Sequence, residues 1–214
     1  MIRFLLVLAF ISLRLPLMAA NYELDLAHSA ITFKIKHLVI STVNGRFDKY
    51  EGIIDFDEAT NKLNKIDVKI DLDSINTNDV KRDAHLKNPD FFGIRNEKGE
   101  LNEAKRFMTF TMTEVKMKGK KFEKVIGNLT LNGITKLVTL DVDYKGATTD
   151  PWGNEKIVFA ASTKIIRKDF GINFNKPLDK PSMKDKVAGM MIGDDVNVVI
   201  EGEANKVNPA PAKK

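Results

Sequence analysis

The sequence predicts an all-β domain in which eight antiparallel strands surround one core, with a single short helical insertion. Apolar and polar residues alternate with a period of two along most of the chain after residue 21, as they do in strands that bury one face. The connections between these segments are mostly short, and no long segment has a helical period. Eight such strands either pack as a sandwich or close into a barrel. We favour closure, because it removes exposed strand edges.

The first three predicted strands carry the clearest alternation. The first strand places four residues on one face: Ile31, Phe33, Ile35 and His37. The second runs from about residue 43 to residue 56, and its apolar parity changes near Asp48 and Lys49, which indicates a bulge in a long bent strand. The third, at residues 65–72, alternates without exception.

Five further strands are predicted after the insertion, at residues 107–117, 122–131, 136–144, 157–165 and 196–200. Turns at Gly119, at Asn132-Gly133 and at residues 150–153 join the first four of them. Residues 167–191 have no regular pattern. Small residues interrupt the inward faces and are expected to leave room inside the barrel: Gly45, Gly52, Gly127 and Ala161.

The insertion at residues 82–92 contains charged side chains, a proline and two adjacent phenylalanines. Asn78 or Asn76 is expected to cap a short helix at residues 80–87, and Pro89 is expected to end it. Long connections that carry both polar and large apolar groups are typical of lids and binding loops. We therefore predict a lid over the barrel.

The first twenty residues have the layout of a secretory signal peptide. Arg3 precedes an apolar run at residues 4–13, and Met18-Ala19-Ala20 ends in small residues. A membrane anchor needs about 20 apolar residues, and Arg14 interrupts the run, so no stable membrane insertion is expected. We predict cleavage and export to the periplasm, with residues 21–205 as the domain and residues 206–214 as a disordered tail.

Composition excludes several classes of function. The formal net charge is +5, but basic and acidic residues are interspersed, so the chain lacks the basic stripe of a nucleic-acid-binding protein. The chain has no cysteine, which excludes disulfides, thiolate catalysis and cysteine–metal sites.

The three histidines, His28, His37 and His85, lack the spacing of a metal motif. No Gly-x-Ser-x-Gly nucleophile motif accompanies them. We therefore expect no metal, no cofactor and no enzymatic activity. A zinc site built from residues distant in sequence remains an alternative.

Eight short motifs occur in order between about Tyr22 and Ala204: Asp25-Leu26-Ala27-His28-Ser29; Gly45-Arg46-Phe47 with Tyr50-Glu51-Gly52; Asp73-Ser74-Ile75; Asn78 with Arg82-Asp83-Ala84-His85-Leu86; Asp90-Phe91-Phe92; Gly127-Asn128-Leu129-Thr130 with Gly133-Ile134-Thr135-Lys136; Arg167-Lys168-Asp169-Phe170-Gly171; and Ile200-Glu201-Gly202-Glu203-Ala204. In these motifs the chain resembles the YceI-like family of exported bacterial lipocalin-like barrels. The chain departs from many relatives in having extra residues at 93–103.

The resemblance implies an eight-stranded lipocalin-like β-barrel whose tunnel holds one long amphiphile, and it makes a homodimer plausible. Family members are associated with polyisoprenoid lipids or isoprenoid quinones, and others with fatty acids or their amides. The family has no established catalytic activity. The implied partner is thus a single-chain lipid or quinone bound as a ligand.

A tunnel for the lipid tail would be lined by inward strand residues, namely Ile31, Phe33, Ile35, His37, Phe47, Phe110, Met112 and Phe159. Each of them would also fit an ordinary core. We expect Phe91, Phe92 and Phe170 near the mouth of the tunnel. The polar candidates for the headgroup are Asn78, Arg82, His85 and Arg167, with Asp83 and Asp169 as orienting partners. The alternative that these charged residues form structural pairs remains open.

The sequence therefore predicts a periplasmic lipid-binding protein that carries or sequesters a polyisoprenoid, an isoprenoid quinone, or a fatty acid or amide. Two alternatives belong to other functional classes. One is a lid-gated lipid-modifying enzyme that uses His85, and the other is a non-catalytic interaction protein with a filled barrel.

Overall fold

The computed structural model describes residues 20–176 and 191–207. The predicted signal peptide, apart from Ala20, and most of the predicted tail lie outside the described residues. The elements in order are β1 (Ala20–Leu24), η1 (Leu26–His28), β2 (Ala30–His37), β3 (Ser41–Phe47), β4 (Tyr50–Asp57), β5 (Lys62–Asp71), η2 (Leu72–Ser74), β6 (Ile75–Asn76), α1 (Val80–Lys87), β7 (Phe107–Lys118), β8 (Lys121–Leu131), β9 (Ile134–Thr149), β10 (Glu155–Ile166), η3 (Arg167–Phe170) and β11 (Ile192–Lys206).

The strands form one closed antiparallel barrel, which confirms the predicted fold class. Eleven strand segments make eight barrel strands, because three barrel strands are each divided into two segments: β1 with β2, β3 with β4, and β5 with β6. The barrel closes at β11, which pairs with β10 along one edge and with both β2 and β1 along the other. Closure leaves the barrel without long exposed strand edges.

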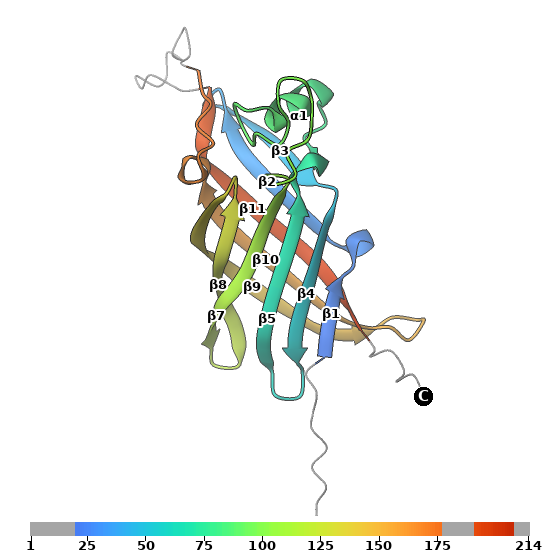
Figure 1. Ribbon diagram of the computed structural model, residues 1–214. Coiled ribbons are helices and arrows are strands. Elements are labelled where there is room, and N and C mark those ends of the chain that lie inside the picture. Colours follow the sequence, from blue (N-terminus) through green and yellow to red (C-terminus); the bar gives the residue numbers. More distant parts are fainter. Residues whose placement is uncertain (1–19, 177–190, 208–214) are drawn as a thin grey trace, which may run out of the picture.

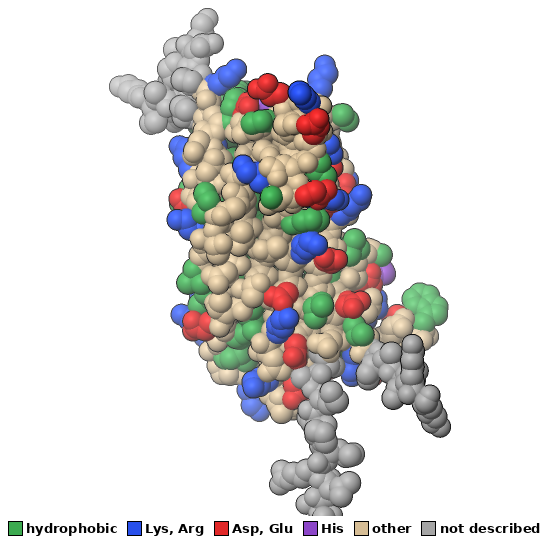
Figure 2. Space-filling view, viewed as in Figure 1, with side chains coloured by type: hydrophobic (Ala, Val, Ile, Leu, Met, Phe, Trp, Pro, Cys, Tyr) green, Lys and Arg blue, Asp and Glu red, His purple; other side chains and the backbone are tan. Residues whose placement is uncertain are grey.

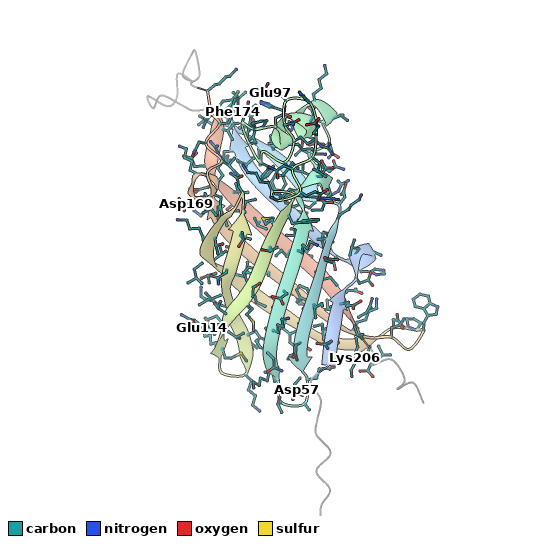
Figure 3. All side chains as sticks on the ribbon, in the orientation of Figure 1. Asp57, Glu97, Glu114, Asp169, Phe174 and Lys206 are labelled. Atoms are coloured by element: carbon teal, nitrogen blue, oxygen red, sulfur yellow. The ribbon has the colours of Figure 1, made fainter. Side chains whose placement is uncertain are left out.

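The barrel is elongated, and its two ends differ (Figure 1). One end carries α1 and the turn between β2 and β3, and we call it the lid end. The opposite end, the far end, carries the turns between β4 and β5 and between β7 and β8 (Figure 1). Figure 3 places Phe174 and Glu97 at the lid end and Asp57 and Lys206 at the far end. In the part of the chain that the structure describes, no helix combines the length and apolar character needed to cross a membrane.

Local sequence explains the strand breaks and turns. The second barrel strand is interrupted at Asp48 and Lys49, where the apolar parity changes. Both backbone N–H groups there bond to Ser74, to its carbonyl oxygen at 3.2 Å and to its Oγ at 2.9 Å. The predicted hairpin at Asn132-Gly133 is confirmed, with φ of 53° and 76° at the two turn residues.

Inward glycines allow aromatic rings to lie against the barrel wall. A Cβ at Gly45 would lie 2.2 Å from Cζ of Phe33, and a Cβ at Gly127 would lie 2.4 Å from Cζ of Phe110. Gly202 has the same relation to Phe159, at 2.8 Å. The expectation that the glycines themselves leave empty room is therefore wrong. Rings from neighbouring strands cover all three of these glycines.

The substitution Gly45→Ala is expected to destabilise the barrel by about 1–3 kcal/mol, because the new methyl group overlaps the ring of Phe33. All three of the closest atoms belong to that ring. The cost should therefore fall below about 1 kcal/mol in a Phe33→Leu background. Urea unfolding of the four proteins of this double-mutant cycle measures the coupling. Equal costs in both backgrounds would contradict the stacking.

Candidate functional site

The barrel holds a cavity of about 500 Å³ that is lined almost entirely by apolar side chains. At the lid end its wall includes Leu86, Phe91 and Phe174. At the other extreme the wall includes Phe56, Phe122 and Tyr144, whose rings pack edge to face with centroids 5.3–5.8 Å apart. The cavity therefore extends along the barrel, with aromatic clusters near both ends.

Most of the inward residues predicted from strand parity line this cavity, including Ile31, Phe33, Ile35, His37, Phe47, Phe110 and Phe159. Met112 does not. The pairing of β7 with β8 shifts between Met112 and Glu114, and beyond this bulge the half-buried position on β7 is Val115. Met112 instead packs, half-buried, against the core.

Phe91 and Phe92 both line the cavity, although they are adjacent in sequence. They lie in a turn rather than in a strand, so the alternation that separates neighbouring strand residues does not apply to them. Phe170 lies outside the cavity. It is buried in η3, and its carbonyl oxygen accepts a hydrogen bond from Nδ2 of Asn132 at 3.2 Å.

The described wall of the cavity contains basic side chains but no aspartate or glutamate. This set, which we call the basic set, contains six residues: Lys36, His37, Arg82, His85, Arg167 and Lys176. Its members come from the end of β2, from α1, and from η3 and the residues that follow it. All of these lie toward the lid end (Figure 1). A polar or anionic headgroup would therefore fit that end better than the apolar middle of the cavity.

Arg82 is fixed by Thr77, which lies two residues before the N-cap of α1. Its Nε donates to Oγ1 of Thr77 and its Nη2 donates to the Thr77 carbonyl, both at 2.8 Å. Asp83 accepts hydrogen bonds from the backbone N–H and the hydroxyl of Thr77, so it orients Arg82 only through this threonine. Nη1 of Arg82 makes no hydrogen bond within the described residues, which leaves it as a donor for a ligand.

Asn78 takes neither of its predicted roles. Its side chain is exposed and does not line the cavity. The N-cap of α1 is Asp79, whose carboxylate accepts from the backbone N–H groups of Lys81 at 3.0 Å and Arg82 at 3.1 Å. Asn78 has a φ of 60° and forms the turn before the cap.

His85 belongs to an aromatic cluster under the lid. Its ring packs edge to face on Phe91 and Phe174, with centroids 5.0 and 5.1 Å away, and those two rings lie 4.8 Å apart. Its Nε2 lies 3.0 Å from Oδ2 of Asp90. Asp90, and not the predicted orienting partner Asp83, therefore holds His85. Phe174 belongs to the irregular segment after η3. By packing on His85 it brings this segment into contact with helix α1 at the mouth of the barrel.

Arg167 is a structural residue. Its side chain is 4% exposed, and its guanidinium donates to the carbonyl oxygens of Gly193 at 2.8 Å, Ile172 at 2.7 Å and Phe174 at 2.9 Å. It also donates to Asp194 at 3.1 Å. Burial lowers the pKa of Arg167 from its ordinary value, although the carboxylate of Asp194 opposes this. The expected pairing with Asp169 is wrong, and little donor capacity is left for a headgroup.

Two aspartates fasten the lid to the barrel. Asp73 accepts two hydrogen bonds from Arg95, at 3.0 and 2.7 Å, and lies 3.3 Å from Nζ of Lys87. Asp71 pairs in the same way with Arg106, at 3.2 and 2.8 Å. Arg95 stands within the extra residues 93–103. Through Arg95 these residues anchor the lid, and Ile94 among them is fully buried.

The lid anchor at Asp73 is expected to depend on pH. Burial opposes ionisation of Asp73, but the hydrogen bonds from Arg95 and Lys87 outweigh it and lower the pKa of the carboxyl. A carboxylate whose pKa is lower in the folded state stabilises the protein above its unfolded pKa, about 3.9, and the contribution disappears as pH falls through the folded value. Asp73→Asn should therefore cost about 2 kcal/mol at pH 7 and progressively less below about pH 4.

Thermal unfolding of the wild type and Asp73→Asn between neutral and acidic pH measures this difference. The melting temperatures should differ by roughly 4–8 °C at neutral pH and should converge in acid. Glu97→Gln is the control, because Glu97 is exposed and makes no ion pair within the described residues. A difference that does not change with pH would show that Asp73 acts through packing rather than through its charge.

Asp25, His28 and Glu203 form the one group in the described part of the chain whose donor atoms could surround a metal ion, all within 4.8 Å of one another. Nζ of Lys156 already lies 3.0 Å from Asp25 and 3.1 Å from Glu203. The hydrogen bond from His28 holds the pKa of Asp25 well below its usual range, despite burial. The cation that these carboxylates hold is therefore Lys156, and the cluster joins β1, β10 and β11.

Sequence reasoning omitted several residues of the cavity. Many lie on inward strand faces that the alternation had identified, and extending those faces would have included them: Ile66, Val68, Ile70, Val138, Leu140, Val142, Tyr144, Val196, Val198 and Ile200. Phe174 and Lys176 follow η3 in a segment without periodicity. Nothing in the local sequence indicates that they turn toward the mouth of the barrel.

Comparison with known proteins places these features in context. The YceI-like domain matches residues 22–204. A UPF0312 protein of Photorhabdus laumondii is 41% identical over 169 residues, which are 78% of this chain and 82% of that protein. The crystal structure of the Campylobacter jejuni YCEI protein is 36% identical, with a TM-score of 0.62 over 82% of this chain and 91% of that one.

A more distant structure shares the fold alone. It is a polyisoprenoid binding domain from Saccharophagus degradans that is implicated in plant cell wall breakdown. It is 16% identical, with a TM-score of 0.54 over 87% of this chain and 98% of that one.

Proposed function

The chain belongs to the YceI-like family, and we propose that it is a periplasmic protein that carries or sequesters one long-chain amphiphile. The ligand would be a polyisoprenoid, an isoprenoid quinone, or a fatty acid or amide. One observation carries this proposal: a cavity of about 500 Å³ with an apolar wall and basic residues toward the lid end. The polyisoprenoid binding domain with the same fold gives further support.

The apolar wall provides the driving force for binding. Each CH₂ group that moves from water into such an environment contributes about 0.8 kcal/mol. A tail of about twenty carbons would gain on the order of 15 kcal/mol before the costs of ordering and association are subtracted. The described wall has no carboxylate that would oppose entry of an apolar chain or of an anionic headgroup.

The polar head would lie beneath α1, near Arg82 and His85. Arg82 keeps one guanidinium nitrogen free of hydrogen bonds within the described residues, while Thr77 holds the rest of the group in place. Fixed guanidinium donors recognise carboxylate and phosphate oxygens well, and they also bind carbonyl oxygens such as those of a quinone or an amide. Arg167 would stabilise the mouth rather than contact the ligand.

Binding without catalysis fits the site better than an enzymatic reaction does. Nε2 of His85 is paired with Asp90, and the hydroxyl of Thr77 is bonded to Arg82 and Asp83. No serine lies in the described wall of the cavity. We therefore favour binding, because the described wall places no serine hydroxyl beside His85.

The periplasmic location rests on the sequence of residues 1–20, with its basic start, apolar run and small residues before Asn21. The absence of cysteine is compatible with export, since the barrel is held together by its apolar core rather than by disulfides.

Native mass spectrometry of the mature protein, purified from the periplasm of its own host, tests the proposal. We expect a stoichiometric adduct of one lipid class, which organic extraction would identify. Protein that carries no lipid, and that also refuses added prenols, quinones, fatty acids and fatty amides, would overturn the proposal and favour an interaction protein.

A further inference from the structure

The turn between β2 and β3 presents three consecutive apolar side chains to solvent. Leu38 and Val39 are each 41% exposed, and Ile40 is 78% exposed. We call these three residues the apolar tip. None of them lines the cavity, so the tip has no role in enclosing the ligand. Contiguous apolar groups at the surface of a protein usually mark a contact with a partner or a membrane.

The backbone of the apolar tip is held in an unfavourable conformation. Leu38 has a φ of 52° and Val39 a φ of 67°, in the left-handed region that β-branched residues rarely adopt. Glycine or asparagine would occupy such a turn at lower cost and without exposing an apolar surface. Strained residues of this kind tend to occur at functional sites, where the surrounding structure fixes them.

The apolar tip continues directly from the cavity wall. His37, the last residue of β2, lines the cavity, and the backbone N–H of Leu38 donates to the carbonyl of Met191, another wall residue, at 2.8 Å. The hydroxyl of Ser41 bonds to the carbonyl of His37 at 2.6 Å and closes the base of the turn. Figure 1 shows this turn at the same end of the barrel as α1.

Along the sequence, the residues around the apolar tip carry charge of one sign. The acids nearby on β11, Asp194 and Asp195, are paired with other basic side chains. The chain has no aspartate or glutamate between Asp25 and Asp48, although acidic and basic residues are interspersed elsewhere, as Figure 2 shows over the barrel. This stretch contains Lys34, Lys36 and Arg46. Lys34 and Lys36 form no ion pair within the described residues, and neither does Lys176, which lines the cavity nearby. These cations therefore remain available to an anionic surface.

We propose that the apolar tip inserts into the interface of an anionic lipid bilayer, while Lys34, Lys36 and Lys176 contact the lipid headgroups. This contact would bring the lid end of the barrel to the membrane surface. It deepens the proposed function by naming the surface where the amphiphile is loaded or released. Shallow insertion of a few apolar side chains combined with basic charge gives reversible binding.

Co-sedimentation with vesicles of phosphatidylethanolamine and phosphatidylglycerol tests the proposal, with neutral phosphatidylcholine vesicles for comparison. The wild type should bind the anionic vesicles and should be released by salt. Ile40→Asp should weaken binding by about tenfold or more, because it places a charge in the interface. The double variant Lys34→Gln/Lys36→Gln should also weaken it, by roughly fivefold for each lysine removed.

Two control variants alter the far end of the barrel. Trp152→Ser removes an 85% exposed side chain from the turn between β9 and β10, and Lys118→Gln/Lys120→Gln removes charge beside the turn between β7 and β8. Both should bind vesicles like the wild type. Loss of binding in these variants, or unchanged binding in Ile40→Asp, would overturn the proposal. A wild type that ignores both kinds of vesicle would also overturn it and would point to a protein partner for the tip.

Native mass spectrometry of the same preparations separates this proposal from the proposed function. Ile40→Asp protein that retains lipid but does not bind vesicles supports docking through the tip. Wild-type protein that binds vesicles but never holds lipid would refute the carrier function and leave the docking surface intact.

Discussion

Replacing Ala161 by phenylalanine is expected to reduce lipid retention by at least about tenfold. Ala161 lies on β10, is 8% exposed, and faces the cavity. A ring at this position would occupy space that the tail needs, and the CH₂ groups it displaces would each lose about 0.8 kcal/mol of binding free energy. The ring enters an apolar cavity rather than a packed core, so the melting temperature should fall by only a few degrees.

Ala160→Phe is the matched control, because the preceding residue on the same strand points to the opposite face of the sheet. Ala160 does not line the main cavity. The same substitution there should leave lipid retention unchanged. Native mass spectrometry and extraction of bound lipid from the two variants give the comparison. Normal retention by folded Ala161→Phe protein would place the ligand outside the cavity.

The period-two pattern predicted the side of each strand that faces the cavity because closure of a barrel leaves little freedom. Phe33, Ile35 and His37 had to share one face, and the hydrogen-bonded register with β3 and β11 keeps them inside. The same argument succeeded for Phe110 and Phe159. It failed at Met112, which shares the parity of Phe110 but packs half-buried against the core without lining the cavity. The register of β7 with β8 shifts directly after it.

The polar part of the site was less predictable, since its contacts join segments far apart in the sequence. The pairs Arg82–Asp83 and Arg167–Asp169 were inferred from proximity along the chain. In the fold, Arg82 bonds to Thr77 and Arg167 reaches Asp194. Both predicted pairs lie within helical turns, α1 and η3, where side chains one or two positions apart point in different directions and do not face each other.

For the lid, the sequence predicted the helix correctly but not its capping residue or its anchor. The helix at residues 80–87 and its end before Pro89 were predicted correctly, since proline restricts the residue that precedes it. The N-cap, Asp79, was not predicted, because Asn76 and Asn78 also have side chains that can cap a helix. The anchor of Arg95 to Asp73 depends on tertiary contact alone.

Replacing Arg167 is expected to reduce the stability of the fold, because its guanidinium holds the segments at the mouth of the barrel together. Arg167→Met should destabilise the protein by about 3 kcal/mol or more, which corresponds to a fall of roughly 6–12 °C in melting temperature. The substitution leaves the carbonyl oxygens of Gly193, Ile172 and Phe174 without their donors in a buried setting. Each unsatisfied buried acceptor costs on the order of 1 kcal/mol or more.

Lys168→Met provides the matched control for this prediction. Lys168 adjoins Arg167 and pairs with the same carboxylate, at 2.8 Å from Asp194, but its side chain is 45% exposed. An exposed ion pair contributes at most about 1 kcal/mol, so the melting temperature should hardly change. If both variants lose the same stability, the charge on Asp194 is what matters. If only Arg167→Met does, the mouth of the barrel depends on the bonds from the guanidinium to the carbonyl oxygens. The second result is the one we expect, because those bonds tie the segment of Phe174 to the start of β11 and thereby hold the aromatic cluster over the cavity.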